Sequence, residues 1–288
     1  MTPEPGIYYD VPFVDYLAWE AESNSKLSLL DISPRAYQLG RHAEPTKPMR
    51  IGSLAHCGVL EPIKFAERYA VMPDFCMDKD NCTADGRPTT SQATAYVKAK
   101  KKAFTDLNPG REIVDRTWYD QTLAIVREIA ANEIASKLLS NPHPAEVSIV
   151  WEERGIAMKA RIDKLGDGKL IDLKTTNDAS TFENAIGRYG YHRQMAHYAA
   201  GWHALTGEIM DCWLVAVEPS APHTVLAAKL SDDALSEGYA ARARLLDGLE
   251  ACRVANQWPP RPNPRQWELP AWASEPIELI HNQQEVSV

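Results

Sequence analysis

The chain is poor in the features that mark secreted, membrane-spanning and metal-thiolate proteins. Its 288 residues include five cysteines, an odd number without a CxxC pair, which argues against a disulfide framework, a zinc knuckle or an iron–sulfur cluster. No apolar run approaches the roughly 18 residues of a membrane span, and the first ten residues lack the basic and apolar regions of a signal peptide. We therefore expect a reduced, cytoplasmic protein with no membrane partner.

Positive charge is also scarce. The 31 lysines and arginines are outnumbered by 39 aspartates and glutamates, which gives a net charge of −8. Nucleic-acid-binding proteins normally concentrate positive charge on their surface, so this balance alone points away from DNA. A carboxylate metal site would account for part of the negative charge, and a local basic groove can coexist with an acidic exterior.

The first of three regions in the expected single domain, residues 1–141, is predicted to be mainly helical. Helix formers with few breakers predict helices at Arg50–Leu60, Ser91–Leu107 and Trp118–Leu139, and residues 72–88 predict a loop. In the third helix, apolar residues recur every three or four positions and predict a stripe that packs on the core. The stripe consists of Leu123, Val126, Ala130, Ile134 and Leu138.

The second region, residues 142–257, changes character toward strands. Segments 146–151, 156–165, 169–175, 211–219 and 224–230 are rich in β-branched and apolar residues, and a Gly166-Asp167-Gly168 turn joins the second to the third. Helices are expected at about Tyr191–Leu205 and from the N-cap Ser231 to about Gln257. The predicted fold is α/β, a central mixed sheet of about five strands flanked by helices. Residues 258–288 form a proline-rich tail that its tryptophans should anchor.

Two of these strands carry the candidate chemistry. Alternate side chains of a strand face the same side, so Asp172 and Lys174 project together while Leu173 faces the core. On the preceding strand Asp163 shares a face with Lys159 and Arg161, and pairing through the glycine turn would bring Asp163 near Asp172. Two converging carboxylates form a hard-oxygen site suited to Mg²⁺ or Mn²⁺, with the Leu173 carbonyl as a further ligand. Such a site suits phosphodiester hydrolysis, with Lys174 supplying charge or helping to deprotonate water.

An isolated Asp-x-Lys pattern usually marks a solvated strand face with a surface ion pair. Here a strand, a turn and a second strand are followed by a helix on which Gln194 and Tyr198 share one face. Five segments in order resemble the RecE/exonuclease VIII nuclease domain and, more distantly, RecB and lambda exonuclease: GSLAHCGVLEP (52–62), EVSIVW (146–151), KARIDKL (159–165), IDLKTT (171–176) and YGYHRQMAHYAAG (189–201).

The resemblance implies a PD-(D/E)xK, restriction-endonuclease-like core. It implies a Mg²⁺-dependent 5′-to-3′ exonuclease that acts on the ends of linear double-stranded DNA and leaves 3′ single strands for phage-type recombination. It also implies a ring-shaped homo-oligomer, a trimer or tetramer, and a single-strand annealing protein as partner. His56 would join the metal site, as would Asp163, Asp172 and Glu146, with Lys174 catalytic. Gln194 and Tyr198 would orient DNA or the metal-site residues.

Substrate contacts are predicted from basic residues around this face. Lys159, Arg161, Arg188 and Arg193 are candidates for phosphate contacts, which give affinity without sequence specificity. The layout of the relatives suggests that Ser25, Ser28 and Arg35 receive a terminal 5′ phosphate. The lysines at 98 and 100–102 are read as a solvated helix face.

Two alternatives stay open. A DNA endonuclease would use the same metal centre, because only a tunnel or an oligomer excludes internal sites. A non-catalytic DNA-binding or scaffold protein could keep the fold, although an intact set of His56, Asp163, Asp172 and Lys174 argues against it.

Overall fold

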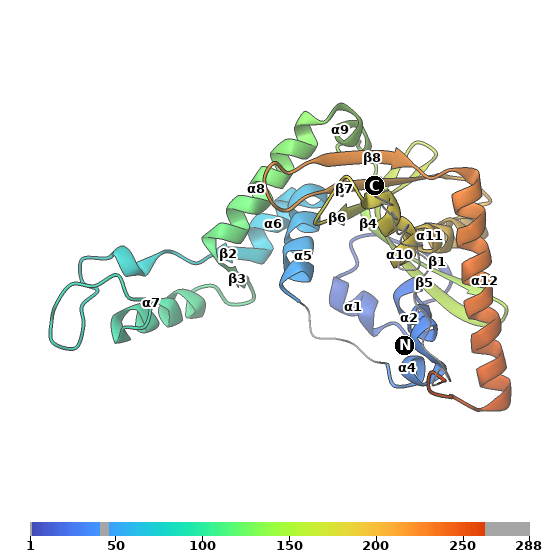
Figure 1. The fold of residues 1–288 in the computed structure, drawn as a ribbon, viewed down its shortest axis with the longest axis horizontal. Helices are drawn as coiled ribbons and strands as arrows, with labels where there is room; N and C mark the ends of the chain where they lie inside the picture. The colour runs from blue at the N-terminus through green and yellow to red at the C-terminus, as the bar shows by residue number, and fades with distance from the viewer. Residues whose placement is uncertain (1, 41–45, 263–288) are drawn as a thin grey trace, which may run out of the picture.

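The largest element of the computed structural model, which describes residues 2–40 and 46–262, is a mixed six-stranded sheet (Figure 1). The strand order is β1-β4-β5-β6-β7-β8, and every neighbouring pair is antiparallel except β6 and β7. The strands are β1 (Gly6–Tyr8), β4 (Ala145–Glu153), β5 (Ile156–Gly166), β6 (Lys169–Thr175), β7 (Asp211–Val217) and β8 (Val225–Lys229). The five strands predicted from the sequence are confirmed, and the sixth, β1, is an edge strand of three residues that was not predicted.

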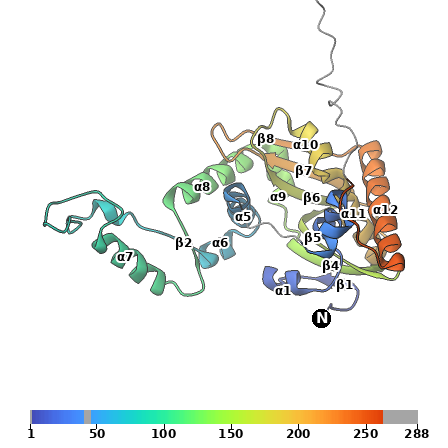
Figure 2. The ribbon, with the colours of Figure 1, turned by 60° about the horizontal axis from the view of Figure 1, so that its bottom comes forward.

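Helices cover both faces of this sheet. Short helices lead into it, namely α1 (Phe13–Ala18), α2 (Asn24–Leu27), α3 (Leu29–Ile32) and α4 (Pro34–Gln38). The longer ones are α5 (Lys47–Leu60), α6 (Pro62–Arg68), α7 (Ala95–Asp106), α8 (Arg116–Ala131), α9 (Glu133–Leu139), α10 (Phe182–Tyr189), α11 (Tyr191–Thr206) and α12 (Asp232–Ala255). Helix α10 was not predicted. Figure 2 shows α5 and α8 on one side of the sheet and α11 and α12 on the other.

Two apolar clusters hold these three layers together. On one face Met195 of α11 and Leu246 of α12 pack with Trp151 of β4 in the larger cluster. On the other face Ile125 of α8 and Ala55 of α5 pack against Leu173 of β6 and its neighbours. Strand β6 contributes Leu170 to the first cluster and Ile171 and Leu173 to the second, so its side chains face both helical layers.

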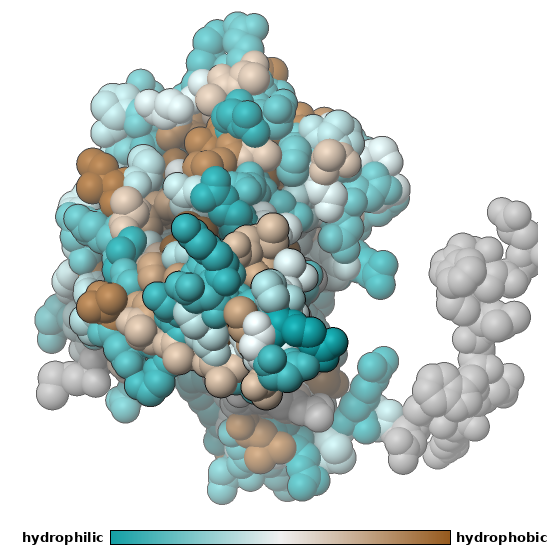
Figure 3. All heavy atoms as spheres, turned by 90° about the vertical axis from the view of Figure 1, so that its left-hand side faces the viewer, coloured by the Kyte–Doolittle hydropathy of each residue, from teal (hydrophilic) through white to brown (hydrophobic). Residues whose placement is uncertain are grey.

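Residues between α6 and α8 leave this body as an arm (Figures 1 and 2). Strands β2 (Tyr69–Val71) and β3 (Glu112–Val114) pair in parallel at its base, and a 3₁₀ turn η1 (Phe75–Met77) and α7 form its outer part. The loop predicted for residues 72–88 is confirmed apart from η1 and an isolated bridge between Cys82 and Pro88. Figure 3, which faces the side from which the arm projects, shows a mostly hydrophilic surface with scattered apolar patches.

The predicted helix 118–139 is in fact two helices, and of its predicted apolar stripe only Leu138 is buried. Helix α8 ends at Ala131, and Asn132 caps α9 by accepting a hydrogen bond from the Ala135 N–H at 3.0 Å. Ile125 and Ile129 are buried, whereas Leu123 and Ile134 are 41% and 52% exposed. The buried face of α8 follows Ile125 and Ile129, which are spaced i, i+4, and not the predicted stripe. The new helix that begins after Asn132 then turns a different set of residues toward the core.

Trp258, at the start of the proline-rich tail, stacks on Tyr37 with ring centroids 5.5 Å apart, and Pro259 accepts a hydrogen bond from Arg35 N–H. The remainder of the predicted tail from residue 263 lies outside the described residues. No helix in residues 2–40 and 46–262 is both long and apolar enough to cross a membrane.

Helix α12 begins as predicted at Ser231, which accepts a hydrogen bond from the Ala234 N–H. It approaches α11 so closely at Gly238 that an added Cβ would lie 2.4 Å from the His192 carbonyl oxygen. Because that neighbour is backbone, we expect Gly238→Ala to lower the free energy of unfolding by about 1–3 kcal/mol in a urea titration.

Gly248 of the same helix has no atom within 4 Å of an added Cβ. Gly248→Ala should therefore leave stability unchanged or raise it by up to about 1 kcal/mol, through helix propensity alone. Equal effects of the two substitutions would contradict the close packing of α11 and α12 at Gly238.

Candidate metal centre

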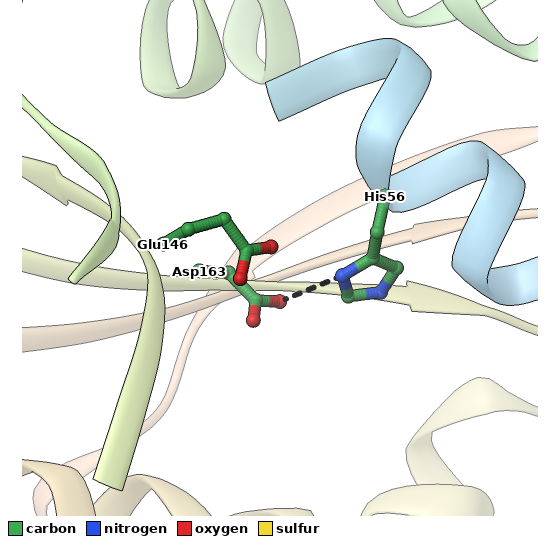
Figure 4. A group of neighbouring side chains, drawn as sticks. All are labelled: His56, Glu146 and Asp163. Atoms are coloured by element: carbon green, nitrogen blue, oxygen red, sulfur yellow. Dashed lines mark ion pairs between the residues drawn. The ribbon is translucent and has the colours of Figure 1, made fainter. Parts of the chain in front are cut away.

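Three side chains from three elements converge beside β6 (Figure 4). His56 comes from α5, Glu146 from β4 and Asp163 from β5, and one ligand atom of each lies within 4.8 Å of the others. His56 Nδ1 is 3.5 Å from Asp163 Oδ2. Mg²⁺ holds its ligands at about 2.1 Å, so two ligand atoms on one ion are at most about 4.2 Å apart, and the His56–Asp163 separation fits.

Asp163 reaches this position because the β5–β6 ladder opens next to it. The backbone register pairs Lys164 with Ile171, and beyond that point the Leu173 N–H donates to Asp163 Oδ2 at 2.8 Å instead of to a backbone carbonyl. The Gly166-Asp167-Gly168 turn that produces this register is present as predicted, with Gly168 at φ +61°. The hairpin therefore brings the two aspartate positions together.

Asp172 and Lys174 form a buried ion pair on the side of β6 that faces α11. Lys174 Nζ is 2.5 Å from Asp172 Oδ2, and their side chains are 16% and 1% exposed. The Gln194 side-chain amide donates to Asp172 Oδ1 at 3.0 Å and to the Tyr198 hydroxyl at 2.6 Å. The two positions predicted to share a helical face are thus hydrogen-bonded to each other, and Gln194 orients Asp172.

Burial and mutual repulsion shape the protonation of the acids. Burial first, and then the neighbouring Asp172 charge, raise the pKa of Asp163 well above its usual value, and burial also raises the pKa of Glu146. An excess of negative charge in a buried site is what a divalent cation neutralises, so the donor set fits such an ion.

His56 suits the same role because it is held neutral. Burial, followed by the Lys174 charge, lowers the pKa of His56 to about 4, although its side chain keeps 27% exposure. A neutral imidazole can coordinate a metal. Hydrogen bonding to the Leu173 backbone works in the opposite direction and raises the pKa of His56, but its effect is smaller than that of burial.

Lys174 behaves as a cation. Burial alone lowers the pKa of Lys174, but the charges of Asp172 and Asp163 outweigh it, so the pKa is raised above its usual value. This direction disagrees with the prediction that neighbours could depress the pKa and let Lys174 help to deprotonate water. Its ammonium lies over the Tyr191 ring, 5.0 Å from the centroid.

Glu146 has a strained backbone conformation, and its carboxylate already has an ion-pair partner. Its φ of +53° lies in the left-handed region, which costs a non-glycine residue roughly 1–2 kcal/mol and is concentrated at functional sites. Its Oε2 is 2.5 Å from Nε of Arg161. Arg161 therefore neutralises Glu146 here, and Glu146 would have to divide its charge between that guanidinium and an ion.

Three of the predicted phosphate contacts are already paired with other groups of the protein. Lys159 is buried and donates to the carbonyls of Tyr16, Leu17 and Trp19. Arg193 is buried and paired with Asp31 at 2.5 Å. Arg161 also bonds the Val11 carbonyl at 2.9 Å, so the three residues tie the N-terminal segment to the sheet and α3 to α11. This placement does not fit the predicted DNA contact for these three residues.

The remaining predicted contacts lie nearer the surface. Arg35 is exposed, and Arg188 is exposed with its guanidinium 5.6 Å from the Tyr189 ring centroid. Ser28 is half-buried and donates to the Ser25 carbonyl at 2.7 Å. It lines a hollow of about 560 Å³ together with Arg188 and Arg193, whereas Arg35 does not. Sequence reasoning gave no role to Tyr191 under Lys174, because only the tertiary approach of α11 to β6 places it there.

Comparisons with known proteins identify the family and the fold. Residues 29–264 match the family described as "PDDEXK-like domain of unknown function (DUF3799)". A crystal structure of a "Putative exonuclease" from Eubacterium rectale superposes with a TM-score of 0.56 at 15% sequence identity, covering 97% of this chain and 100% of that chain. No curated protein shows significant sequence similarity. At this identity the structural likeness concerns the fold.

A mixed sheet between helical layers, with acids and a lysine converging at the β5–β6 hairpin, defines a nuclease fold of the PD-(D/E)xK class. The family match spans most of the sequence, so the chain belongs to the PDDEXK-like family.

Proposed function

We propose that the protein is a metal-dependent deoxyribonuclease that acts through the centre described above. The observation that carries the proposal is the convergence of His56, Glu146 and Asp163 within 4.8 Å, beside the buried Asp172–Lys174 pair. A divalent ion bound there would lower the pKa of an attacking water and neutralise charge on the phosphate. Mg²⁺ is the expected ion, and Mn²⁺ should substitute, because both accept carboxylate and carbonyl oxygens.

The chain's own residues have distinct tasks in this proposal. His56 and Asp163 hold the ion, with Asp172 and the Leu173 carbonyl beside them. Gln194 keeps Asp172 oriented through its 3.0 Å hydrogen bond, and Tyr198 fixes Gln194 in turn. The Lys174 ammonium stabilises negative charge that develops on the phosphate, because a fixed cation in a buried site needs no reorganisation.

The finer proposal is a 5′-to-3′ exonuclease of the RecE/exonuclease VIII type. It acts on ends of linear double-stranded DNA, leaves 3′ overhangs for recombination, and works as a homo-oligomeric ring with a single-strand annealing partner. The five ordered segments that resemble those nucleases support it, and so does the name of the Eubacterium rectale protein. Arg188, Arg35 and Ser28 would contact the DNA backbone.

Linear and closed circular duplexes test the activity directly. With Mg²⁺ or Mn²⁺ we expect nucleotide release from linear DNA only, abolished by EDTA, and faster from 5′-labelled than from 3′-labelled ends. Cutting of the circle would show an endonuclease instead. Binding without release of nucleotides from any DNA would favour a non-catalytic protein.

Asp163→Asn tests the site within the same assay. The substitution keeps a side-chain oxygen that can accept the Leu173 N–H but removes the charge, so Mn²⁺ should bind at least about tenfold more weakly by calorimetry. Nucleotide release should fall in parallel. Asp167→Asn is the matched control, because Asp167 lies in the same hairpin with its side chain 92% exposed. Unchanged Mn²⁺ affinity in Asp163→Asn would remove this residue from the centre.

A further inference from the structure

A cleft of about 720 Å³ lies next to the metal centre, within the roughly 300–1,000 Å³ typical of small-ligand sites. Four of its lining residues, Met49 among them, belong to the elements that carry the centre. Gly52 lies one turn before His56 in α5, Tyr191 lies three residues before Gln194 in α11, and Thr175 follows Lys174 in β6. Residues spaced by three or four share a helical face, so the cleft lies on the same faces of the two helices as His56 and Gln194.

The contact between α5 and β6 in this cleft is tight. An added Cβ at Gly52 would lie 3.3 Å from the Thr175 hydroxyl oxygen, so the helix backbone itself approaches the strand end. Thr175 directly follows Lys174, so a ligand in the cleft lies near the end of β6 that carries the Asp172–Lys174 pair.

A second part of the cleft lining is a loop held in place by hydrogen bonds. The loop after β6 is held by Asp178, whose Oδ1 accepts from the Ser180 N–H at 2.9 Å and whose Oδ2 accepts from the Thr181 hydroxyl at 3.1 Å. Glu218 accepts from the Ala179 N–H at 2.8 Å. The hydrogen bonds that Asp178 accepts lower its pKa, so its carboxylate stays ionised and fixed where it lines the cleft.

Beyond this loop the lining becomes aromatic. Tyr189, at the end of α10, is 60% exposed and lies 5.8 Å from the Tyr191 ring, which itself stacks on Phe182. Arg188 lines the same cleft. These groups suit a nucleotide. The exposed aromatic ring can stack on the base, the guanidinium can bind the phosphate, and the side-chain amides and hydroxyls can hydrogen-bond the polar edges of the base.

We infer that this cleft binds one unpaired nucleotide next to the phosphate that is cut, with its base stacked on Tyr189. The inference rests on the proposed nuclease function and makes it specific. The DNA end must open by one nucleotide before cleavage, and an end that is already unpaired binds better because that opening costs free energy.

The test compares Tyr189→Ala, Tyr189→Phe and the unchanged protein on linear duplexes whose terminal pair is matched or mismatched. Loss of stacking on one base weakens binding by about tenfold or more. We expect Tyr189→Ala to raise the KM of the mismatched substrate by about tenfold with little change in kcat, and Tyr189→Phe to behave like the unchanged protein. Tyr9→Ala is the matched control, since Tyr9 is 55% exposed outside the cleft.

A second readout separates this inference from the nuclease proposal. Duplexes with 2-aminopurine as the terminal base are bound in EDTA, where no cleavage occurs. Quenching on binding should be strong for the unchanged protein and for Tyr189→Phe, and lost in Tyr189→Ala. Equal quenching and equal KM for Tyr189→Ala would overturn the inference even if DNA is cut. Absence of cleavage with quenching that depends on Tyr189 would overturn the nuclease proposal alone.

Discussion

Lys174→Gln should lower the rate of DNA hydrolysis by about a hundred- to a thousandfold, the range found when one preorganised charge-stabilising group is removed. The Lys174 side chain is only 16% exposed, and the charges of Asp172, at 2.5 Å, and of Asp163 keep its ammonium protonated. Glutamine is one atom shorter than lysine, is polar and carries no charge. Single-turnover cleavage of linear duplex DNA at saturating Mg²⁺ measures the chemical step directly.

The control for this substitution is Lys137→Gln. Lys137 pairs with Glu133 on the surface of α9 with 74% of its side chain exposed, so losing it should leave cleavage unchanged. Far-ultraviolet circular dichroism should show both variants folded. If folded Lys174→Gln cuts DNA as fast as the unchanged protein, the ammonium has no part in stabilising the transition state.

The central hairpin could be predicted from the sequence because its signals are local. The alternation in β6 places Asp172 and Lys174 on one face, and the two-glycine turn fixes the register that brings Asp163 alongside. His56 was placed by resemblance alone, since nothing in an isolated histidine on a helix indicates which strand the helix will cover.

The basic residues of β5 show where local reasoning fails. Alternation correctly places Lys159 and Arg161 on one face, but their partners are carbonyls more than 100 residues earlier in the chain, at Trp19 and Val11. Alternation along a strand shows which side chains share a face of the sheet, but it does not show which other segment of the chain packs on that face. The three-residue β1 is likewise too short to show the alternation of apolar and polar residues that predicts a strand. It forms because it can pair with the free edge of β4.

Arg242→Met should lower the free energy of unfolding by about 3–5 kcal/mol, the cost of breaking a buried ion pair by removing one partner. Arg242 of α12 is 5% exposed, and its guanidinium bonds both carboxylate oxygens of Glu153 in β4, at 2.8 and 2.5 Å. Its Nε donates to His197 Nδ1 at 3.1 Å. Methionine fills part of the volume but leaves the Glu153 carboxylate without its cation.

His197 makes this network cooperative. Its Nδ1 accepts from Arg242, so its Nε2 carries the hydrogen and donates to the Lys159 carbonyl at 3.0 Å. Burial, then the Arg242 charge, lowers the pKa of His197 to about 3, which keeps the ring neutral as this bonding requires. Urea titration should therefore show a large loss for Arg242→Met and less than about 1 kcal/mol for Arg244→Met, whose pair with Glu237 is 64% and 61% exposed. Similar losses for both would mean that the α12–β4 network adds no more to stability than a surface ion pair.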